Sequence, residues 1–388
     1  MRILLVNSHG ADAAVGGAET YVAALARGLR ARDHDVRILA AFPARQPESD
    51  DAAAPTTVLH SSDWRDDRIR LYRNRAGDMT AWPTPRLRRL LAEIAPDVVH
   101  TNNLPGITTA VWETARRQRT PVVHTLHDYY LLCPRMTLFG TPERPCCGHP
   151  TLCGARRSRL HRWSTGVSDV VGVSRYIVDQ HLDAFPTARR HVIRHPALPG
   201  AVPTPAATAG LKSIGYLGSL DEIKGIGVLL DAAPELRDRG YAIHIAGNGR
   251  LRPQVEQSAR AGLVEYHGSV GGAEKTGFLE RSDVGIVPSL WPEPGGPPYV
   301  VLEWLAARRP VLVSDRGGLA ESAAAFPGAV TFEPTRQGMV SAVEALSTAG
   351  AWQAAVEGIG AVGSPDELDR WLGEHEDVYR TATGGGDP

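Results

Sequence analysis

Short apolar runs alternate along almost the whole chain with segments in which apolar residues recur every three or four positions. A run of four to eight apolar residues is typical of a buried strand, and the wider spacing is typical of an amphipathic helix. In the first half the pattern predicts strands at residues 3–6, 36–40, 98–100, 122–126, 170–173 and 192–194. It predicts helices that include residues 21–29, 87–94 and 111–117, and an irregular stretch at 43–78.

Residues 196–209 interrupt this alternation with four prolines, which cannot continue a helix or a central strand. We therefore interpret this segment as a linker. After it the pattern restarts. It predicts strands at residues 213–217, 242–246, 264–267, 284–287 and 311–314. It predicts helices at residues 226–236, 252–260 and 299–307, and a last one at about 365–380.

Repeated strand–helix–strand units predict parallel sheets that are covered by helices on both faces. The chain is thus expected to be an α/β protein with two doubly wound Rossmann-like domains. The first domain would span residues 1–195 and the second residues 210–364, joined by the linker at 196–209.

Length and charge support this division. A chain of 388 residues is long for one core. Residues 1–195 carry 27 arginines and no lysine against 19 acidic residues, a net charge of +8. The rest carries 15 basic and 24 acidic residues, a net charge of −9. The basic half would suit an anionic acceptor, or the two halves would simply attract each other, and both interpretations stay open.

No run of about 18 apolar residues occurs, so no membrane-spanning helix is predicted. The first apolar run, residues 3–6, is too short for a signal peptide, and a cytoplasmic protein is therefore expected. An arginine-rich helix at Arg156–Arg162 would either make a peripheral membrane contact or present a solvated face. Nothing in the sequence predicts a nucleic-acid partner.

The loops that follow predicted strands are where ligands bind in this architecture. Gly16-Gly17-Ala18-Glu19 follows the first strand and opens a helix. Glycines let backbone N–H groups approach an anion, and a helix N-terminus adds a positive dipole, so this is a phosphate site or a tight turn. His127-Asp128 follows strand 122–126. Here the histidine would bind a sugar hydroxyl, move a proton, or cap the local backbone.

The second half has two such loops. Lys224, one of three lysines in the chain, stands at the start of a predicted helix. An ammonium group there opposes the helix dipole and needs an anion, which favours a diphosphate contact over the alternative of an ordinary surface lysine. Loop 288–298 contains Gly295 and Gly296, whose N–H groups could face a phosphate or a sugar. Glu293 in this loop and Glu303 in the next helix are carboxylates of the kind that bind vicinal hydroxyls. The apolar neighbours of Glu303 argue against a purely solvent-facing role.

Taken in order, these motifs resemble family 4 of the retaining glycosyltransferases, which adopt the GT-B fold, and the likeness covers nearly the whole chain. The family's Gly-Gly-x-Glu, His-Asp, Lys-Gly and paired-glutamate motifs match Gly16–Glu19, His127-Asp128, Lys224-Gly225, and Glu293 with Glu303.

The chain departs from the family pattern at three places. Ser219 stands where the family usually has an arginine that helps to hold the diphosphate, so either another basic group helps or the leaving group is held less well. Nine residues separate Glu293 and Glu303, where the family usually has seven. Gly295 replaces the aromatic residue that usually follows Glu-Pro, which opens room near the sugar.

The resemblance implies an enzyme, a glycosyltransferase that moves a hexose-type sugar with retention of configuration and without a catalytic metal or other cofactor. The partners implied are a nucleotide diphosphate sugar, UDP favoured over GDP, and a hydroxyl acceptor on a glycan, a lipid-linked molecule or a natural product. A β-phosphate oxygen of the donor would take the acceptor proton. Two alternatives stay open: a nucleotide-sugar epimerase of the same fold, and a sugar-nucleotide-binding protein without catalysis.

The resemblance also implies residue roles. Lys224 and loop N–H groups would stabilise the departing diphosphate, which Gly17 would approach from the first domain. Glu293 would orient the sugar, Glu303 the ribose hydroxyls, and His127 a far sugar hydroxyl. The donor site would further include Ser219, Gly295 and Gly296. The resemblance implies as well that the two parallel sheets face each other across a cleft, and that the last helix, at about 365–380, crosses back onto the first domain.

Four cysteines, Cys133, Cys146, Cys147 and Cys153, lie within 21 residues. Thiolates so close together could hold a structural zinc ion, although their spacing lacks the usual C-x-x-C pair. Unligated thiols are the alternative.

Overall fold

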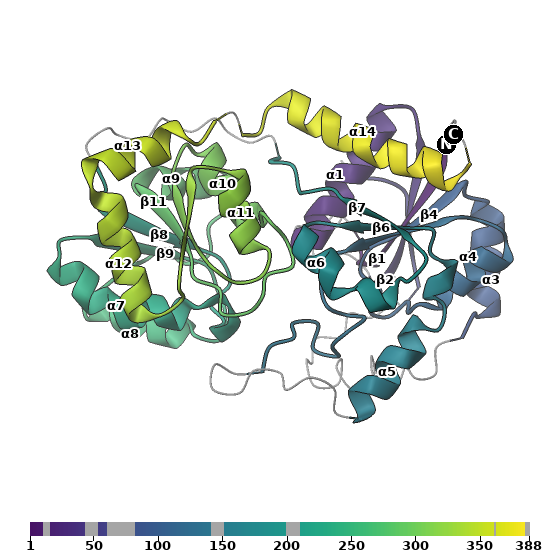
Figure 1. The fold of residues 1–388 in the computed structure, drawn as a ribbon, viewed down its shortest axis with the longest axis horizontal. Coiled ribbons are helices and arrows are strands. Elements are labelled where there is room, and N and C mark those ends of the chain that lie inside the picture. Colours follow the sequence, from purple (N-terminus) through teal and green to yellow (C-terminus); the bar gives the residue numbers. More distant parts are fainter. Residues whose placement is uncertain are drawn as a thin grey trace. The chain divides into compact units, whose positions relative to one another are not determined.

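The computed structural model describes residues 1–10, 16–42, 53–59, 82–140, 151–198, 210–360 and 362–384. They form two compact units (Figure 1). The first unit contains the described residues of Met1–Gly140, Arg144–Arg194 and Asp369–Pro388, and the second contains those of His195–Leu368.

The first unit is built on a parallel sheet of seven strands in the order β3-β2-β1-β4-β5-β6-β7. Its strands are β1 (Arg2–His9), β2 (Asp35–Phe42), β3 (Thr56–Val58), β4 (Val98–Thr101), β5 (Val122–Leu126), β6 (Asp169–Gly172) and β7 (Arg189–Val192). Its helices are α1 (Gly17–Ala31), α3 (Pro85–Ile94), α4 (Ala110–Arg117), α5 (Thr151–His161) and α6 (Arg175–Gln180), with 3-10 turns η1 (Ser164–Gly166) and η2 (Leu182–Ala184). Helices pack on the sheet, so central strands such as β5 are buried along their whole length.

The second unit is built on a parallel sheet of six strands in the order β10-β9-β8-β11-β12-β13. Its strands are β8 (Ser213–Leu217), β9 (Ala242–Ala246), β10 (Glu265–Tyr266), β11 (Val284–Val287), β12 (Val311–Ser314) and β13 (Ala329–Phe332). Its helices are α7 (Ile226–Asp238), α8 (Arg252–Arg260), α9 (Gly272–Arg281), α10 (Tyr299–Ala306), α11 (Leu319–Ala325), α12 (Arg336–Ser347) and α13 (Ala349–Glu357), and a 3-10 turn η3 (Glu222–Lys224) precedes α7. The prediction of two parallel, doubly wound sheets is confirmed.

The last helix, α14 (Pro365–Ala382), belongs to the first unit from Asp369 onward. Its buried face is polar as well as apolar. The hydroxyl of Tyr379 lies 2.6 Å from Nδ1 of His100, and Nε2 of His100 lies 2.6 Å from the hydroxyl of Thr125. On the same helix His375 is hydrogen-bonded to Tyr21 of α1. These bonds tie α14 to α1 and to two central strands, because unpaired polar groups would be costly at such buried positions.

Strand β7 begins three residues earlier than the run at 192–194 predicts. Its register places Arg189 opposite Asp169 of β6, and the Asp169 carboxylate accepts hydrogen bonds from Arg189 at 2.7 Å and from His191 at 2.9 Å. Although burial opposes it, these bonds lower the pKa of Asp169 to about 2. The position of this strand is therefore set by charge pairing with a buried carboxylate rather than by its apolar residues.

Other differences lie at the sheet edges. The short edge strand β3 lies inside the stretch at 43–78 that we expected to be irregular, and β13 was not predicted. His195, which the sequence analysis placed in the first domain, lies in the second unit, where its ring stacks on Tyr299 at 4.7 Å. Residues 199–209 of the expected linker lie outside the described residues. Among the helices that the structure describes, none has the length and apolar character needed to cross a bilayer.

Candidate functional site

The strand order of the second sheet reverses between β8 and β11. In open parallel sheets the carboxyl ends of strands at such a reversal form the usual ligand site. The loop after β8 carries Lys224, and the loop after β11 carries Glu293. Nζ of Lys224 donates a hydrogen bond of 2.7 Å to Oε1 of Glu293. The structure thus brings together two residues that the sequence analysis singled out separately.

The Glu293 carboxylate is buried, with 6 % of its side chain exposed, whereas Lys224 is one-third exposed. The hydroxyl of Ser289 also donates to Oε1, at 2.6 Å. Both hydrogen bonds that the structure describes for this carboxylate therefore go to Oε1. The Lys224 ammonium lies 5.0 Å from the centre of the Trp291 ring, a distance at which cations are attracted to aromatic faces. The arrangement leaves one carboxylate oxygen and part of an ammonium group available to a ligand.

Lys224 does not begin a helix, as the sequence analysis expected. It ends the 3-10 turn η3, and Gly225 follows in the left-handed region with φ of 72° before α7 starts at Ile226. A Cβ atom on Gly225 would lie 1.8 Å from the carbonyl oxygen of Pro288, so only glycine fits this approach. The backbone N–H of Leu290 donates to the carbonyl of Ile223 at 2.9 Å. The loops that carry Lys224 and Glu293 are therefore locked together through their backbones.

A second cation lies beside Ser219. The Ser219 hydroxyl donates a hydrogen bond to Oδ2 of Asp221, and Oδ1 of Asp221 accepts from the backbone N–H of Arg250 at 3.2 Å and from its Nε at 3.3 Å. Although burial opposes it, these contacts lower the pKa of Asp221. The Arg250 side chain is 86 % exposed, and its two terminal NH₂ groups have no acceptor within the described part of the chain.

Arg250 was missed in the sequence analysis. Two features of the sequence point to it. Arg250 directly follows Gly247-Asn248-Gly249 after a strand, and Ser219 stands where the family usually has a basic residue. Loop contacts fix its position. Leu220 N–H donates to the Asn248 carbonyl at 2.9 Å, and a Cβ atom on Gly247 would lie 1.7 Å from the Gly218 carbonyl oxygen. The loops after β8 and β9 thus touch along their backbones.

Tyr216 of β8 stabilises the loop that carries Ser219. Its hydroxyl donates a hydrogen bond of 2.6 Å to the carbonyl of Ser219. Burial, together with the nearby carboxylates of Glu293 and Asp221, raises the pKa of Tyr216 well above its ordinary value. The phenol therefore stays protonated and acts as a permanent donor.

Glycines also join the loops after β11 and β12. The N–H of Gly318 donates to the carbonyl of Glu293 at 2.7 Å. A Cβ atom on Gly296 would lie 2.3 Å from the Gly318 carbonyl oxygen, and one on Gly318 would lie 2.7 Å from that of Gly295. Close backbone packing thus explains why Gly296 has no side chain. That Gly295 and Gly296 face a donor stays a prediction.

Glu303 lies on α10, which begins at Tyr299 as predicted. Oε1 of Glu303 accepts a hydrogen bond of 3.0 Å from Nζ of Lys275 on α9, and both side chains are about one-third exposed. The sequence analysis gave Lys275 no role. A ribose contact by Glu303 stays a prediction, and a ligand hydroxyl would share this carboxylate with Lys275.

In the first unit, the corresponding reversal of strand order lies between β1 and β4. Gly16 caps α1, whose first residue is Gly17, and Oε1 of Glu19 lies 3.8 Å from Nδ1 of His9. Residues 11–15 of this loop lie outside the described residues. The helix N-terminus at Gly17 can receive an anion, as such termini do.

His127 and Asp128 follow β5. Nε2 of His127 lies 2.9 Å from Oδ1 of Asn102, which follows the neighbouring strand β4. The Tyr21 ring meets the His127 ring edge-on at 4.6 Å between centres. Asp128 accepts a hydrogen bond of 2.7 Å from the Tyr130 N–H. Burial raises the pKa of Asp128 to about 6, a shift that this hydrogen bond and the nearby Arg156 reduce.

Arg156 corrects one expectation. From the sequence it was expected on a basic helix, with a face either solvated or in contact with a membrane. Its side chain is instead buried, and Nη1 donates a hydrogen bond of 2.7 Å to the Tyr130 carbonyl. Its guanidinium also lies 4.8 Å from the centre of the Tyr130 ring. Arg156 therefore fixes the loop after His127 rather than forming part of an exposed face.

The expected four-cysteine site falls partly outside the described residues. Cys133 is buried and Cys153 is half-buried, whereas Cys146 and Cys147 lie in the segment that the structure does not describe. Zinc binding by this cluster stays a prediction.

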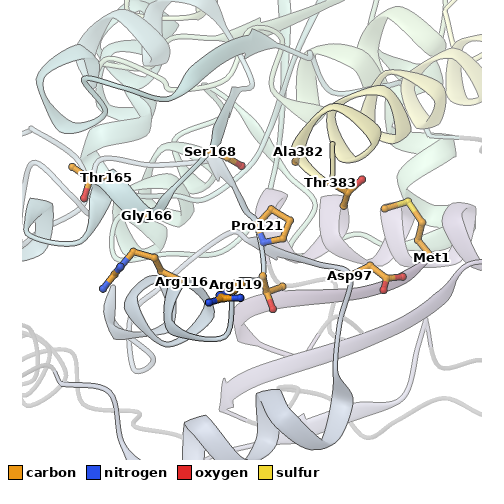
Figure 2. A pocket seen from close by; sticks show the side chains of 11 residues that line it. Met1, Asp97, Arg116, Arg119, Pro121, Thr165, Gly166, Ser168, Ala382 and Thr383 are labelled. Atoms are coloured by element: carbon orange, nitrogen blue, oxygen red, sulfur yellow. The ribbon is translucent and has the colours of Figure 1, made fainter. Parts of the chain in front are cut away.

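An open pocket of about 760 Å³ lies elsewhere in the first unit (Figure 2). Its lining includes Asp97, Pro121 and Ser168, which directly precede β4, β5 and β6. In Figure 2, Arg116 and Arg119 lie on one side of this pocket and Asp97 on the other. The pocket is thus at the amino ends of the strands, the edge opposite to the one where parallel sheets bind ligands, and we do not assign the donor to it.

Comparison with known proteins identifies the family of the chain. Residues 15–197 match the model described as Glycosyltransferase Family 4, and residues 211–348 match that of Glycosyl transferases group 1. A phosphatidyl-myo-inositol mannosyltransferase of Mycobacterium leprae is 28 % identical over 325 residues, which are 81 % of this chain and 79 % of that protein. An uncharacterized 42.6 kDa protein of the cps region of Klebsiella pneumoniae is 26 % identical over 348 residues, 84 % of this chain and 88 % of the relative.

Solved structures of similar fold include the sucrose-phosphate synthase of Thermosynechococcus elongatus, with a TM-score of 0.73, 16 % identity and 99 % of both chains covered. The Anabaena protein HepE in complex with UDP has a TM-score of 0.70 and 16 % identity, and the match covers 98 % of this chain and all of that one. At such identities these likenesses show the fold alone, which is GT-B.

Proposed function

The chain belongs to glycosyltransferase family 4, and we propose that it transfers a hexose from a nucleotide diphosphate sugar to a hydroxyl acceptor with retention of anomeric configuration. We propose a UDP-sugar as the donor in preference to a GDP-sugar. The single observation that carries the proposal is the contact of Lys224 with Glu293 at the reversal of strand order in the second sheet.

In this proposal the Lys224 ammonium stabilises the charge that develops on the departing diphosphate. A fixed cation in a partly desolvated site acts strongly on such charge and needs no reorganisation during the reaction. Glu293 and Trp291 hold the ammonium in place before the donor arrives. Oε2 of Glu293 then accepts a hydrogen bond from a sugar hydroxyl, while Oε1 keeps its bonds to Ser289 and Lys224.

Arg250 supplies the second positive charge. It lies next to Ser219, the position at which the family usually has an arginine, and Asp221 fixes its Nε while its terminal NH₂ groups stay available. Those groups present paired donors that suit phosphate oxygens. The Arg250 side chain thus replaces, from the loop after β9, the cation that Ser219 lacks.

The remaining roles follow the family pattern. A β-phosphate oxygen of the donor takes the acceptor proton as the sugar–phosphate bond breaks, so the protein needs no nucleophile of its own. Glu303 binds the ribose hydroxyls, Gly17 the diphosphate and His127 a sugar hydroxyl. The hydrogen bond of His127 with Asn102 and its contact with Tyr21 support this last role, because they fix the orientation of the imidazole ring.

Two relatives bear on the substrates. The similar mycobacterial proteins are named as mannosyltransferases that act on phosphatidyl-myo-inositol, and HepE was solved with UDP and with UDP-glucose. These names support a hexosyl donor and fit a lipid-linked acceptor, while glycan and natural-product acceptors remain candidates for the same chemistry. We further propose a cytoplasmic protein, with membrane contact only at its periphery, that uses no catalytic metal.

The test is a thermal-shift screen against UDP-, GDP-, ADP- and dTDP-sugars, since a ligand that binds the folded state raises its stability by mass action. The stabilising donor is then incubated with acceptors, and the anomeric configuration of the product is read by NMR. A glycosidic product with the same anomeric configuration as the donor supports the proposal. Inversion of a ring centre in the nucleotide sugar without acceptor would indicate the epimerase. Donor binding without turnover by any acceptor would indicate a binding protein.

A further inference from the structure

A cluster of two histidines and a glutamate lies at the edge of the second sheet, on residues to which the proposed transfer gives no role. His244 lies on β9, Glu265 on β10, and His267 directly after β10. One ligand atom of each lies within 4.8 Å of those of the other two, the only such group within the described ranges. From this geometry we propose that His244, Glu265 and His267 form a binding site for a divalent transition-metal ion such as Zn²⁺.

Strand pairing creates the cluster. In the parallel register of β9 and β10, Glu265 lies opposite His244. Side chains alternate between the faces of a strand, so Glu265 and His267 share the face that carries His244. Tyr266 points to the other face, where its hydroxyl donates to the Gly247 carbonyl at 2.9 Å. A two-residue strand thus presents two ligands beside a third from its neighbour.

The distances fit a tetrahedral ion. Nδ1 of His244 lies 3.3 Å from Nε2 of His267 and 3.4 Å from Oε2 of Glu265. Ligands bound to zinc at 2.0–2.1 Å in tetrahedral geometry lie about 3.3 Å apart. The remaining separation, between His267 and Glu265, is within 4.8 Å, and the exposed Glu265 side chain can rotate to shorten it.

The chemistry of the three ligands favours the same class of ion. Imidazole suits zinc, nickel and cobalt, whereas calcium and magnesium prefer sites made only of oxygen. His244 is nearly buried, and the His267 ring packs edge-on against Phe278 at 5.4 Å, so both imidazoles are held in place. Glu265 is 62 % exposed, which gives an ion access from solvent and leaves a fourth position for water.

A bound ion would fasten the edge strand to the sheet and, through it, the loop that carries Arg250. The N–H of Gly247 donates a hydrogen bond of 2.7 Å to the carbonyl of Gly268, the residue that directly follows His267. Metal binding would therefore stabilise β10 and the Gly247–Arg250 loop together. This role is structural, and it stands whether or not the chain transfers a sugar.

The experiment uses the full chain, purified after chelation, with Co²⁺ and Zn²⁺ as probes. Cobalt distinguishes this site from the cysteines, because thiolate ligands give an intense near-ultraviolet charge-transfer band and nitrogen–oxygen ligands do not. We expect one equivalent of Co²⁺ to bind without that band. Zinc at 100 times its dissociation constant should raise Tm by about 5 °C.

Two variants test the assignment. The variants are His267→Ala and Glu265→Gln, the second at an exposed residue. Each should weaken Co²⁺ binding at least tenfold and abolish the rise in Tm. Glu256→Gln, a neighbouring carboxylate on α8, is the matched control and should bind like the wild type. Because Glu265 is mostly exposed, its variant should fold normally. The proposal would be overturned if no Co²⁺ binds, or if all the bound Co²⁺ shows the thiolate charge-transfer band. It would also be overturned if both variants bind Co²⁺ with the affinity of the wild type.

Discussion

Lys224 and Glu293 are 69 residues apart in the chain, yet the Lys224 ammonium lies 2.7 Å from the Glu293 carboxylate. Each follows a different strand, and the two strands are neighbours at the point where the order of the sheet reverses. The basic partner is partly open to solvent and the acidic one is buried. A preformed pair of this kind can meet a diphosphate with its cation and a sugar hydroxyl with its carboxylate.

The first prediction concerns this pair. Lys224→Ala should lower kcat by about 10²- to 10³-fold, because the charge on the departing diphosphate loses a fixed cation. Glu293→Gln should lower kcat/KM by at least about tenfold. Since the two side chains touch, the double variant should lose less than the sum, with a coupling energy of about 1 kcal/mol or more. Steady-state kinetics of the four proteins measures this, and additive losses would contradict a shared role.

The second prediction assigns a role to Arg250. Arg250→Ala should lower kcat/KM about tenfold, because its guanidinium no longer reaches the diphosphate. In that background Ser219→Arg should recover part of the loss, since it restores the family's usual cation at a neighbouring position. Arg252→Ala removes a nearby, half-exposed arginine paired with Glu256, and serves as the control. Equal activity of Arg250→Ala and Arg252→Ala would exclude Arg250 from the donor site.

A third prediction compares alanine substitutions at Gly225 and Gly227, which lie two positions apart. Gly225→Ala places a Cβ 1.8 Å from the Pro288 carbonyl oxygen in a left-handed backbone conformation. It should lower the free energy of unfolding by more than about 3 kcal/mol and displace Lys224. Gly227→Ala, two residues on inside α7, meets nothing within 4 Å and should stabilise by about 0.5–1 kcal/mol. Urea unfolding of both variants measures the difference, and similar stabilities would refute the close approach.

The fourth prediction concerns pH. Asp128 has a pKa of about 6 in the folded protein, above its ordinary value of 3.8, because burial disfavours the carboxylate. The folded state therefore keeps this proton between about pH 4 and 6 after the unfolded state has lost it. Asp128 thus makes stability fall as pH rises through this window, by up to about 3 kcal/mol.

Asp128→Asn should remove that contribution while its side-chain oxygen still accepts from the Tyr130 N–H. Urea unfolding at pH 4, 5, 6 and 7, compared between wild type and variant, isolates the effect. We expect the variant to gain relative stability steadily from pH 4 to 6 and to change little above pH 7. A constant difference across the series would show that Asp128 titrates normally.

Much of the fold could be read from local patterns. Strands 122–126, 213–217, 242–246, 284–287 and 311–314 were predicted at their observed bounds, because central parallel strands are continuous apolar runs. The edge strands β3 and β13 were not predicted, because they are only partly buried and lack such a run. β7 was misplaced because its register depends on Asp169, a residue on another strand.

The two parallel α/β sheets, the family and the loops that hold the candidate site could be recognised without coordinates, because short-range periodicity and glycine-rich strand ends are local properties of the chain. Which side chains meet became clear only from the folded chain. It paired Lys224 with Glu293, supplied Arg250 beside Ser219, buried Arg156, and assembled His244 with Glu265 and His267. The physical reason is that strand order and register bring together residues far apart in the chain, and no local pattern records those contacts.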